Sequence, residues 1–493
     1  MALVPMGALP EFHAQRDPDR IALVHESQRL TRREFANLSN RYARALSQLG
    51  VREGDFVTIA LPNCIEFHLS SFAIWKLGAI PNVISPNLPI AEREAILDQV
   101  KPSLVISDDD SGTAGYRWVS KVALSQTECS DNNLDSRVAL HWKAMTSGGS
   151  TGRPKVIVDQ LPSCWDPGVG SLEMLPDRVV LNPGPLYHNA PFVFSHMALF
   201  VGCKVVVMTR FDAEEALRLI AEHKVDWVTL VPTMMHRIWR LPEATRRKYD
   251  LSSLRVVLHM AAPCPIWLKE WWIDWLGPER IFELYAGTER QGFTSITGQE
   301  WLEHKGSVGK VGAGFGLKVL DLDGNTLAPG EVGEIYFLPE AGPGSTYRYL
   351  GAEPRRAGNW ESLGDMGYLD EDGYLYLADR RTDLILSGGA NIYPAEVESA
   401  IDAHPDVLSS AVIGLPDDDM GQLVHAIVQL KPGLRGDEAE NELRTFIAER
   451  LTKYKRPRSF EFVDSPLRDD AGKVRRSQLR EDRISASAAR PRG

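Results

Sequence analysis

Cysteine is scarce in this sequence, with five residues among 493, scattered and without a C-x-x-C pair. This usage suits a reducing cytoplasm, and each thiol is expected to be an ordinary core or surface residue. No run of about 20 uncharged apolar residues is present, so we expect no membrane span. The first residues also lack the basic start and apolar stretch of a signal peptide. These absences together predict a cytoplasmic protein.

Positive charge is also in deficit. The formal net charge is −11, which argues against a nucleic-acid-binding surface. The composition, 43% hydrophobic and 25% charged residues, is typical of a soluble globular protein. Because 493 residues exceed one ordinary hydrophobic core, at least two domains are expected.

Between residues 30 and 260 the chain alternates strand-like and helix-like patterns. Thr31 and Glu34 carry the signature of a capping box, and the helix that they open is expected to end at Gly50. The further expected elements are strand Phe56–Leu61, helix Ile65–Leu77, strand Ser103–Ser107, strand Val205–Met208, helix Ala213–His223 and strand Trp227–Val231. Such alternation predicts an α/β fold with two doubly wound subdomains of largely parallel sheet.

The pattern changes twice downstream. Short strands bounded by glycine, Glu334–Leu338 and Gly373–Leu377, predict a small antiparallel β region within residues 305–380. A helix, two strands and a helix then predict a compact α+β domain (395–403, 407–413, 424–430 and 438–451). We therefore divide the chain into an N-terminal domain, 1–381, and a C-terminal domain, 382–493, with a disordered tail over the last ten residues.

A glycine-rich loop, S-G-G-S-T-G-R-P-K at residues 147–155, is the most informative segment. Its glycines permit backbone N–H groups to approach an anion, so it is a candidate phosphate loop. It is not a Walker loop, because Arg153 and Pro154 separate Gly152 from Lys155. A plain Gly/Ser linker is the alternative. The candidate phosphate-binding residues are Ser147, Gly149, Ser150, Thr151, Gly152 and Lys155.

Two acidic segments follow at long intervals. Residues 285–289, Y-A-G-T-E, place the hydroxyl of Thr288 beside the carboxylate of Glu289 at the end of an apolar run. A carboxylate near a phosphate site is suited to a bridging Mg²⁺, and a turn with a solvated glutamate is the alternative. Asp365, with glycines on both sides, is suited to accept hydrogen bonds from the vicinal hydroxyls of a ribose, or is a turn aspartate.

Two basic segments complete the pattern. Arg380 precedes the double glycine Gly388-Gly389, which leads into a Pro-Ala-Glu helix start. Lys473 lies in G-K-V-R-R, a basic stretch near the end of the chain. A lysine there is able to deliver a point charge to a reacting carboxylate or phosphate, although by itself it is typical of a surface lysine.

The joint occurrence of these segments in this order resembles the adenylate-forming superfamily, which includes acyl-CoA synthetases, firefly luciferase and the adenylation domains of peptide synthetases. The family's phosphate loop, [ST]-S-G-[ST]-T-G-x-P-K, matches 147–155, its Y-G-x-T-E segment matches 285–289, and its G-K-x-x-R segment matches 472–476. Its ribose-binding acid matches Asp365 and its arginine matches Arg380. The resemblance spans nearly the whole chain, residues 30–480.

The resemblance implies an ATP-dependent acyl-CoA ligase that works in two half-reactions. A carboxylate attacks the α-phosphorus of ATP, which gives an acyl adenylate and pyrophosphate, and the thiol of coenzyme A then displaces AMP. The implied cofactors are ATP, Mg²⁺ and CoA, and the implied partner is a small carboxylic acid. The oligomeric state stays open, with a homodimer as one option. Charge neutralisation and in-line positioning carry such a reaction.

The resemblance also assigns roles around the phosphates. Ser150, Thr151 and Lys155 hold the β- and γ-phosphates, and Thr288 contacts the α-phosphate. Glu289 ligates Mg²⁺, with Thr151 as a further candidate ligand. The remaining residues of the implied nucleotide-binding set are Ser147, Gly149, Gly152, Ala262 and Tyr285.

The other implied roles lie at the ribose and in the mobile C-terminal domain. Asp365 and Arg380 grip the ribose, and Lys473 bridges the substrate carboxylate and the α-phosphate. The domain is expected to rotate between the half-reactions, which brings Gly388 and Gly389 to the pantetheine tunnel.

Several positions depart from the family's pattern. Gly148 replaces a serine, Val156 replaces the glycine after the lysine, and Ala286 replaces the first glycine of Y-G-x-T-E. Thr382 stands at the hinge, where relatives have Asp or Lys, and Leu467 stands where a proline is usual. None of these changes removes a charged catalytic group, so we expect an active enzyme.

The acyl pocket is ambiguous. Relatives carry G-A-A-P where this chain has Met260 before Ala261-Ala262-Pro263, and methionine changes the pocket's shape. His188, in an aromatic–histidine turn like that of the family, is expected to gate the pocket or the CoA channel, or to be a buried, hydrogen-bonded histidine. The tryptophans at 267, 271, 272 and 275 have helical spacing and form either a lipid or steroid platform or a stripe in a core or an interface.

The phosphate loop and this pocket segment resemble the branch that activates bile acids and steroid side chains. The expected substrate is therefore a hydrophobic acid, with medium-chain fatty acids and aryl acids as alternatives. Other functions are an acyl-AMP ligase that loads a carrier protein, a luciferase-like oxygenase and an inactive adenylate-binding protein. The inactive protein would be expected to lose Lys473 or Glu289, and both are present.

Overall fold

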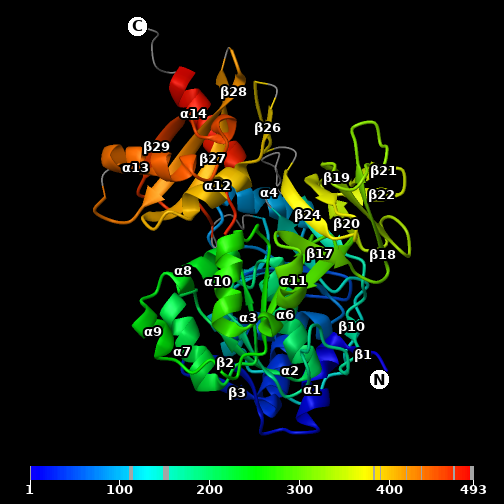
Figure 1. Ribbon diagram of the computed structural model, residues 1–493. Coiled ribbons are helices and arrows are strands. Elements are labelled where there is room, and N and C mark those ends of the chain that lie inside the picture. The colour runs from blue at the N-terminus through cyan, green and yellow to red at the C-terminus, as the bar shows by residue number, and fades with distance from the viewer. Residues whose placement is uncertain are drawn as a thin grey trace.

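The computed structural model describes residues 2–109, 115–147, 155–380, 383–388, 390–417, 419–434, 436–469 and 472–488. Two sheets with their helices form the large N-terminal domain, and a separate sheet with three helices forms the smaller C-terminal domain (Figure 1). The predicted boundary at 381/382 stays a prediction, because both residues lie outside the described ranges.

The first sheet combines early strands with one very late strand. Its order is β20 (Tyr347–Leu350), β9 (Lys155–Asp159), β8 (Ala144–Ser147), β5 (Ile80–Val83), β4 (Phe56–Ala60), β6 (Leu104–Ser107) and β7 (Trp118–Val119). The strands from β8 to β7 run parallel, whereas β9 and β20 pair antiparallel. The strands that flank the glycine-rich loop therefore lie side by side near one edge.

The second sheet passes from a parallel to an antiparallel half. Its order is β21 (Arg355–Ala357), β22 (Trp360–Ser362), β19 (Gly333–Pro339), β23 (Asp365–Leu369), β24 (Leu375–Arg380), β17 (Ser307–Val311), β16 (Phe293–Thr297), β15 (Ile281–Ala286), β14 (Val256–Met260), β13 (Trp227–Leu230), β11 (Val179–Asn182), β12 (Lys204–Val207), β2 (Ile21–His25) and β3 (Gln28–Thr31). Strand β18 (Phe315–Leu320) pairs with β19. The strands from β15 to β2 are parallel, so the predicted small β region continues this sheet.

Helices cover both sheets and fill the space between them. They are α1 (Leu9–Ala14), α2 (Arg32–Gln48), α3 (Ile65–Lys76), α4 (Ile90–Val100), α5 (Lys121–Gln126), α6 (Asn189–Val201), α7 (Ala213–His223), α8 (Pro232–Trp239), α9 (Glu243–Arg247), α10 (Ile266–Leu276) and α11 (Gly298–Glu303). Short 3₁₀ turns (Met6–Ala8, Pro278–Arg280 and Lys453–Lys455) and a small ribbon of β1 (Val4–Pro5) with β10 (Cys164–Trp165) complete the connections.

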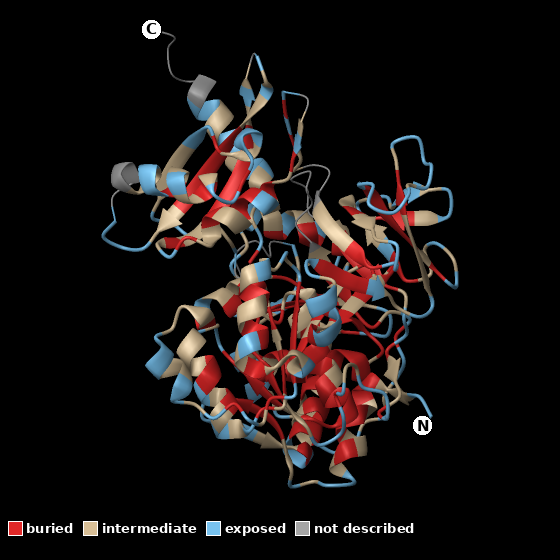
Figure 2. Ribbon diagram, in the orientation of Figure 1, coloured by how far each residue is buried: buried red, intermediate tan, exposed pale blue. Residues whose placement is uncertain are grey.

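One hydrophobic core joins the two sheets of the N-terminal domain. It contains apolar residues of β4 and β6 from the first sheet, of β12 and β13 from the second, and of α2, α3 and α6. Eleven of the twelve residues of helix α3 are buried, as expected for a helix packed within the core. Figure 2 shows the buried residues gathered where these helices meet the sheets. The two sheets are therefore held as one body.

The sequence predicted the local elements of the N-terminal domain closely. The capping box is confirmed, since Thr31 N donates to Glu34 Oε2 at 2.8 Å and Glu34 N donates to Thr31 Oγ1 at 3.2 Å. The ends of β4, α3, β6, β12, α7 and β13 lie within one residue of their predicted ends. Within the described ranges, no helix is both long and apolar enough to cross a bilayer.

The C-terminal domain has a core of its own. Its sheet has the order β26 (Ala390–Ile392), β25 (Ile385–Ser387), β28 (Gly421–Leu430) and β27 (Val407–Asp417), with β29 (Ser459–Val463) parallel to β28. Its helices are α12 (Pro394–Asp402), α13 (Gly436–Ala448) and α14 (Arg476–Ala488).

The predicted disordered tail is wrong for its first residues, because α14 extends to Ala488. Arg480 Nε donates to the carbonyl oxygen of Gly414 at 2.9 Å. Arg483 Nη2 donates to Glu461 Oε1 at 2.7 Å. These bonds fasten the helix to the sheet, and composition alone does not reveal them.

Candidate active site

Glu289 is the centre of a compact polar cluster. It lies just beyond the end of β15 and is only 5% exposed. Its Oε1 accepts hydrogen bonds from the Tyr349 hydroxyl at 2.6 Å and from Lys155 Nζ at 3.4 Å. Lys155 Nζ also donates to the Tyr349 oxygen at 2.9 Å. The structure thus joins the first sheet to the second at the predicted phosphate and magnesium residues.

Tyr349 was not among the residues predicted from the sequence. It lies on β20, whose partner β9 begins at Lys155, so the pairing of these two strands places it beside Glu289. Burial raises the pKa of Tyr349, and the Glu289 carboxylate raises it further. The hydroxyl is therefore protonated and donates. The alternation of Tyr347 and Tyr349 indicates a strand, but no local signal indicates which sheet that strand joins.

A second polar pair lies in the same sheet as Glu289. The Tyr285 hydroxyl, from the end of β15, donates to Asp365 Oδ2 at 2.8 Å. Asp365 begins β23 and stands opposite Arg380 in the register of β23 with β24. The structure therefore brings together three predicted nucleotide-binding positions.

The acyl-pocket segment follows β14. Ala261 has a positive φ of 72°, a conformation that costs a residue with a side chain about 1–3 kcal/mol and that clusters at functional sites. The neighbouring Ala262 is half-buried. His188 is the N-cap residue of α6 and is also half-buried, with its ring 4.8 Å from that of Tyr187. Ala261 directly follows β14, and His188 precedes α6 in the connection that follows β11 of the same sheet.

Lys473 lies in a loop that contacts the N-terminal domain. Its backbone N–H donates to Asp469 Oδ1 at 2.9 Å. A side chain on Gly472 would collide with α8, because its Cβ would lie 2.8 Å from Thr233 Oγ1. Arg475 Nη1 lies 3.7 Å from Glu92 Oε2 of α4. The loop is therefore seated between α8 and α4.

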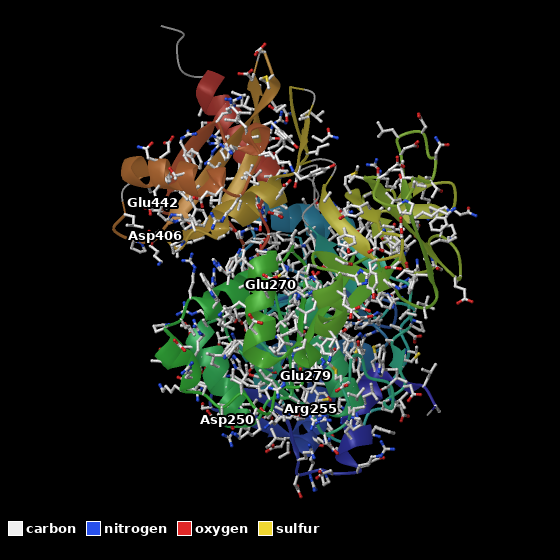
Figure 3. All side chains as sticks on the ribbon, in the orientation of Figure 1. Asp250, Arg255, Glu270, Glu279, Asp406 and Glu442 are labelled. Carbon is white, nitrogen blue, oxygen red and sulfur yellow. The ribbon has the colours of Figure 1, made fainter. Side chains whose placement is uncertain are left out.

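Electrostatic interactions between the two domains continue along α8. Burial lowers the pKa of Arg240, just after α8, while Asp402 and Asp406 of the C-terminal domain counteract that shift. Figure 3 shows Asp406 on the side of the C-terminal domain that faces the N-terminal domain. Acidic groups of one domain thus face a cation of the other.

Some predicted residues lie outside the described ranges. These are Gly149, Ser150, Thr151 and Gly152 of the glycine-rich loop, Gly389, and the altered positions Gly148 and Thr382. Ser147 and Lys155 stand opposite each other where β8 ends and β9 begins. Gly388 lies in the C-terminal domain, where its N–H donates to the Met420 carbonyl oxygen at 2.9 Å. Thr288 is half-exposed next to Glu289.

The residues around Glu289 fit a magnesium ion that is held mainly by a nucleotide. Among the described residues, no group of three or more His, Cys, Asp or Glu side chains is able to hold a metal ion. Mg²⁺ in nucleotide-dependent enzymes is usually bound by one or two carboxylates together with phosphate oxygens and water. A single, nearly buried carboxylate beside the lysine of the candidate phosphate loop meets that requirement.

Comparisons with known proteins agree with this arrangement. A family model described as AMP-binding enzyme matches residues 11–350, and one described as AMP-binding enzyme C-terminal domain matches residues 396–473. The 2-succinylbenzoate–CoA ligase of Geobacillus kaustophilus is 33% identical, over 96% of this chain and 98% of its own length.

Two solved structures are similar to the whole chain. One is o-succinylbenzoate CoA synthetase from Bacillus subtilis with its acyl-adenylate intermediate, with a TM-score of 0.81, 28% identity, and 97% of this chain and 98% of that chain covered. The other is the same synthetase with ATP and magnesium ion, with a TM-score of 0.80, 28% identity, and coverage of 97% and 100%.

Proposed function

Because the chain belongs to the family of AMP-binding enzymes, we propose that it joins an aromatic carboxylic acid of the 2-succinylbenzoate type to coenzyme A. The class of enzyme, an ATP-dependent, AMP-forming acyl-CoA ligase, follows from relatives that match over nearly the whole chain. The aromatic acid rests on one observation, the 33% identity to a 2-succinylbenzoate–CoA ligase over 96% of this chain.

The 2-succinylbenzoate–CoA ligases that match this chain at 30–33% identity do not support the steroid or fatty acid that the sequence motifs suggested. The tryptophans of α10 do not support it either. Trp272 is 2% exposed and belongs to the core of the second sheet, and Trp267, Trp271 and Trp275 pack partly buried against that core. They form the core stripe rather than an exposed lipid platform.

In the proposed reaction two anions, the acid and the triphosphate, have to meet. Lys155 would neutralise phosphate charge, and Glu289 would hold the magnesium ion. The bound ion supplies further positive charge to the phosphate oxygens. Asp365, fixed by Tyr285, accepts hydrogen bonds from the ribose. Lys473 enters from the loop seated on α8 and α4 and bridges the two reacting groups.

The proposal is tested with a panel of acids, with pyrophosphate release and CoA-thioester formation measured separately. The panel contains 2-succinylbenzoate, benzoate, a medium-chain fatty acid and a steroid acid, each with and without CoA. We expect 2-succinylbenzoate to give the highest kcat/KM and a CoA thioester. Faster turnover of the fatty or steroid acid would overturn the aromatic assignment. Adenylation without any thioester would favour the alternative, loading of a carrier protein.

The role of Lys473 is tested by separating the half-reactions. Lys473→Ala is expected to slow adenylation by about 10²–10³-fold, because it removes one preorganised charge. Thioester formation from supplied acyl-AMP is expected to persist. Lys453→Ala is the matched control, since Lys453 is an exposed lysine of the same domain outside this loop. Equal loss of both half-reactions in Lys473→Ala would contradict this role.

A further inference from the structure

Two cations converge on a buried aspartate behind the Glu289 cluster. Asp159, the last residue of β9, is 2% exposed. Lys143 Nζ lies 3.3 Å and Arg290 Nε 3.2 Å from the same oxygen, Asp159 Oδ2. Lys143 is fully buried, and burial lowers its pKa while Asp159 counteracts the shift. We call these two contacts the Asp159 bridge.

The bridge connects the two sheets. Lys143 directly precedes β8, and Asp159 N donates to the Lys143 carbonyl oxygen at 3.1 Å, so both residues lie at the end of the β8–β9 pair opposite to Lys155. Arg290 belongs to the second sheet, in the connection from β15 to β16, and directly follows Glu289. The strands that flank the glycine-rich loop are thereby tied to the Glu289 segment.

Adjacent residues of this segment are held by charges of opposite sign. Glu289 contacts the cation of Lys155 at one end of β9, whereas Arg290 contacts the anion of Asp159 at the other end. A shift of the segment by one residue would place like charges together, which is unfavourable. The two contacts together therefore define one position of Glu289 relative to β9.

The contribution of the bridge to stability is expected to be small. Lys143 Nζ, Asp159 Oδ2 and Arg290 Nε form no well-aligned hydrogen bond within the described part of the chain. A buried ion pair tends to break even against desolvation as a whole, although removal of one partner is costly when the other charge is left uncompensated. For Arg290 that cost is limited, because Lys143 still faces Asp159. Arg290 moreover has a positive φ of 54°, which is costly for a residue with a side chain. Backbone strain of this kind persists where the surrounding structure holds the residue in that conformation.

We infer that Arg290 and Asp159 are positioning residues, which hold the Glu289 carboxylate beside Lys155, where it would serve a magnesium–nucleotide complex. The inference rests on the proposed function for the nature of the ligand. Loss of a residue that orients a metal ligand typically costs about 10–100-fold in metal affinity or activity. The effect is expected in magnesium dependence more than in folding.

The test is a titration of the full-length protein with Mg²⁺ at fixed ATP, followed by calorimetry and by ATP–pyrophosphate exchange. Arg290→Gln is expected to raise the Mg²⁺ midpoint by about 10–100-fold with little change in melting temperature. Arg290→Lys is expected to recover part of the loss. Arg348→Gln is the matched control, because Arg348 is exposed and directly precedes Tyr349 on β20. A wild-type midpoint in Arg290→Gln would overturn the inference.

A second variant removes the shared anion. Asp159→Asn is expected to raise the Mg²⁺ midpoint in the same way, and an unchanged midpoint in a folded variant would count against the bridge. If Asp159→Asn does not fold, the Mg²⁺ midpoint of Arg290→Gln remains the deciding measurement, because the Arg290 side chain is 35% exposed. Calorimetry of Mg–ATP binding needs no carboxylic acid substrate. The positioning role of Arg290 and Asp159 is therefore tested independently of the proposed substrate. Wild-type protein that binds Mg–ATP but activates no acid of the panel would overturn the proposed substrate alone.

Discussion

At the scale of single residues, the hydroxyl of Tyr349 is the clearest test of the Glu289 cluster. Tyr349→Phe removes a donor at 2.6 Å from Glu289 and keeps the ring, whose centroid lies 4.3 Å from Lys155 Nζ. A hydrogen bond to a charged group is worth about 1.5–3 kcal/mol, so kcat/KM for adenylation is expected to fall about 10–100-fold. Steady-state pyrophosphate release measures the loss.

Tyr347→Phe is the control for that variant. Tyr347 lies on the same strand with its ring 4.9 Å from that of Tyr349, and within the described ranges its hydroxyl makes no hydrogen bond to Glu289 or Lys155. Its removal is expected to leave kcat/KM unchanged within about twofold, because no charged partner is lost. A similar loss in both variants would show that strand packing, and not the contact with Glu289, is responsible.

Sequence motifs located only part of the cluster. Lys155 and Glu289 belong to segments with fixed spacing between glycines, hydroxyls and charges, and such spacing is visible along the chain. Tyr349 contacts Glu289 and Asp159 contacts Arg290 across the two sheets, at a separation of 60 positions in the first case. No local pattern encodes a contact of that range, so these residues emerge only from the fold.

At the scale of elements, local sequence signals predicted the ends of helices and strands well, but they did not predict which strands pair. Helix α7 matches its predicted bounds because Asp212 caps it, accepting from Glu215 N at 2.9 Å, and because its apolar face has the helical period. The placement of β20 in the first sheet was not predicted, and its neighbours along the chain, β19 and β21, belong to the second sheet. Periodicity indicates a strand but not its partner.

Arg476, the last residue of the G-K-V-R-R segment, anchors the C-terminal domain. Glu398 of α12 is 4% exposed and accepts from Arg476 Nη2 at 2.8 Å and from Val412 N at 2.8 Å. Arg476 Nη1 also donates to Asp383 Oδ2 at 2.9 Å, one residue beyond the expected hinge. The first residue of α14 is thus tied to α12 and to the start of the domain.

Arg476→Met is expected to destabilise this domain by about 3 kcal/mol, near the lower end for a broken buried pair. The lower end applies because Arg468 Nη2 remains 3.2 Å from Glu398. Urea unfolding followed by far-UV circular dichroism measures the loss. Arg475→Met, at a side chain that is 65% exposed, is expected to change stability by less than about 0.5 kcal/mol. Equal effects in the two variants would contradict the anchoring role.

At the scale of the whole molecule, buried neutral histidines make stability depend on pH. Burial lowers the pKa of His13 to about 4 and those of His68 and His236 to about 3, and it lowers the pKa values of His196 and His259 well below 6.5. Below pH 6.5 the unfolded chain binds protons at these sites and the folded chain does not. Stability is therefore expected to fall as the pH drops from 6.5 toward 4.

Two buried carboxyls act in the opposite direction. Burial raises the pKa of Asp402 to about 6 and also raises the pKa of Glu283, so protonation of these groups favours the folded state as the pH falls. Because the five histidines outnumber these two carboxyls, stability is still expected to fall as the pH drops. Urea midpoints measured at pH 7, 6 and 5 are expected to decrease in that order, and a constant midpoint would contradict the argument.

The antiparallel pairing of β9 with β20 has a consequence for synthesis of the protein. β9 has apolar residues at 156–158, and the strand that covers its outer edge arrives only with Tyr347–Leu350. At about 5–20 residues per second, the 194 positions from Lys155 to Tyr349 take about 10–40 s to translate. During that interval the nascent chain carries an unpaired, apolar edge, which is prone to join other chains. Ribosome-bound chains that end before residue 347 are therefore expected to need a chaperone more than chains that already contain β20.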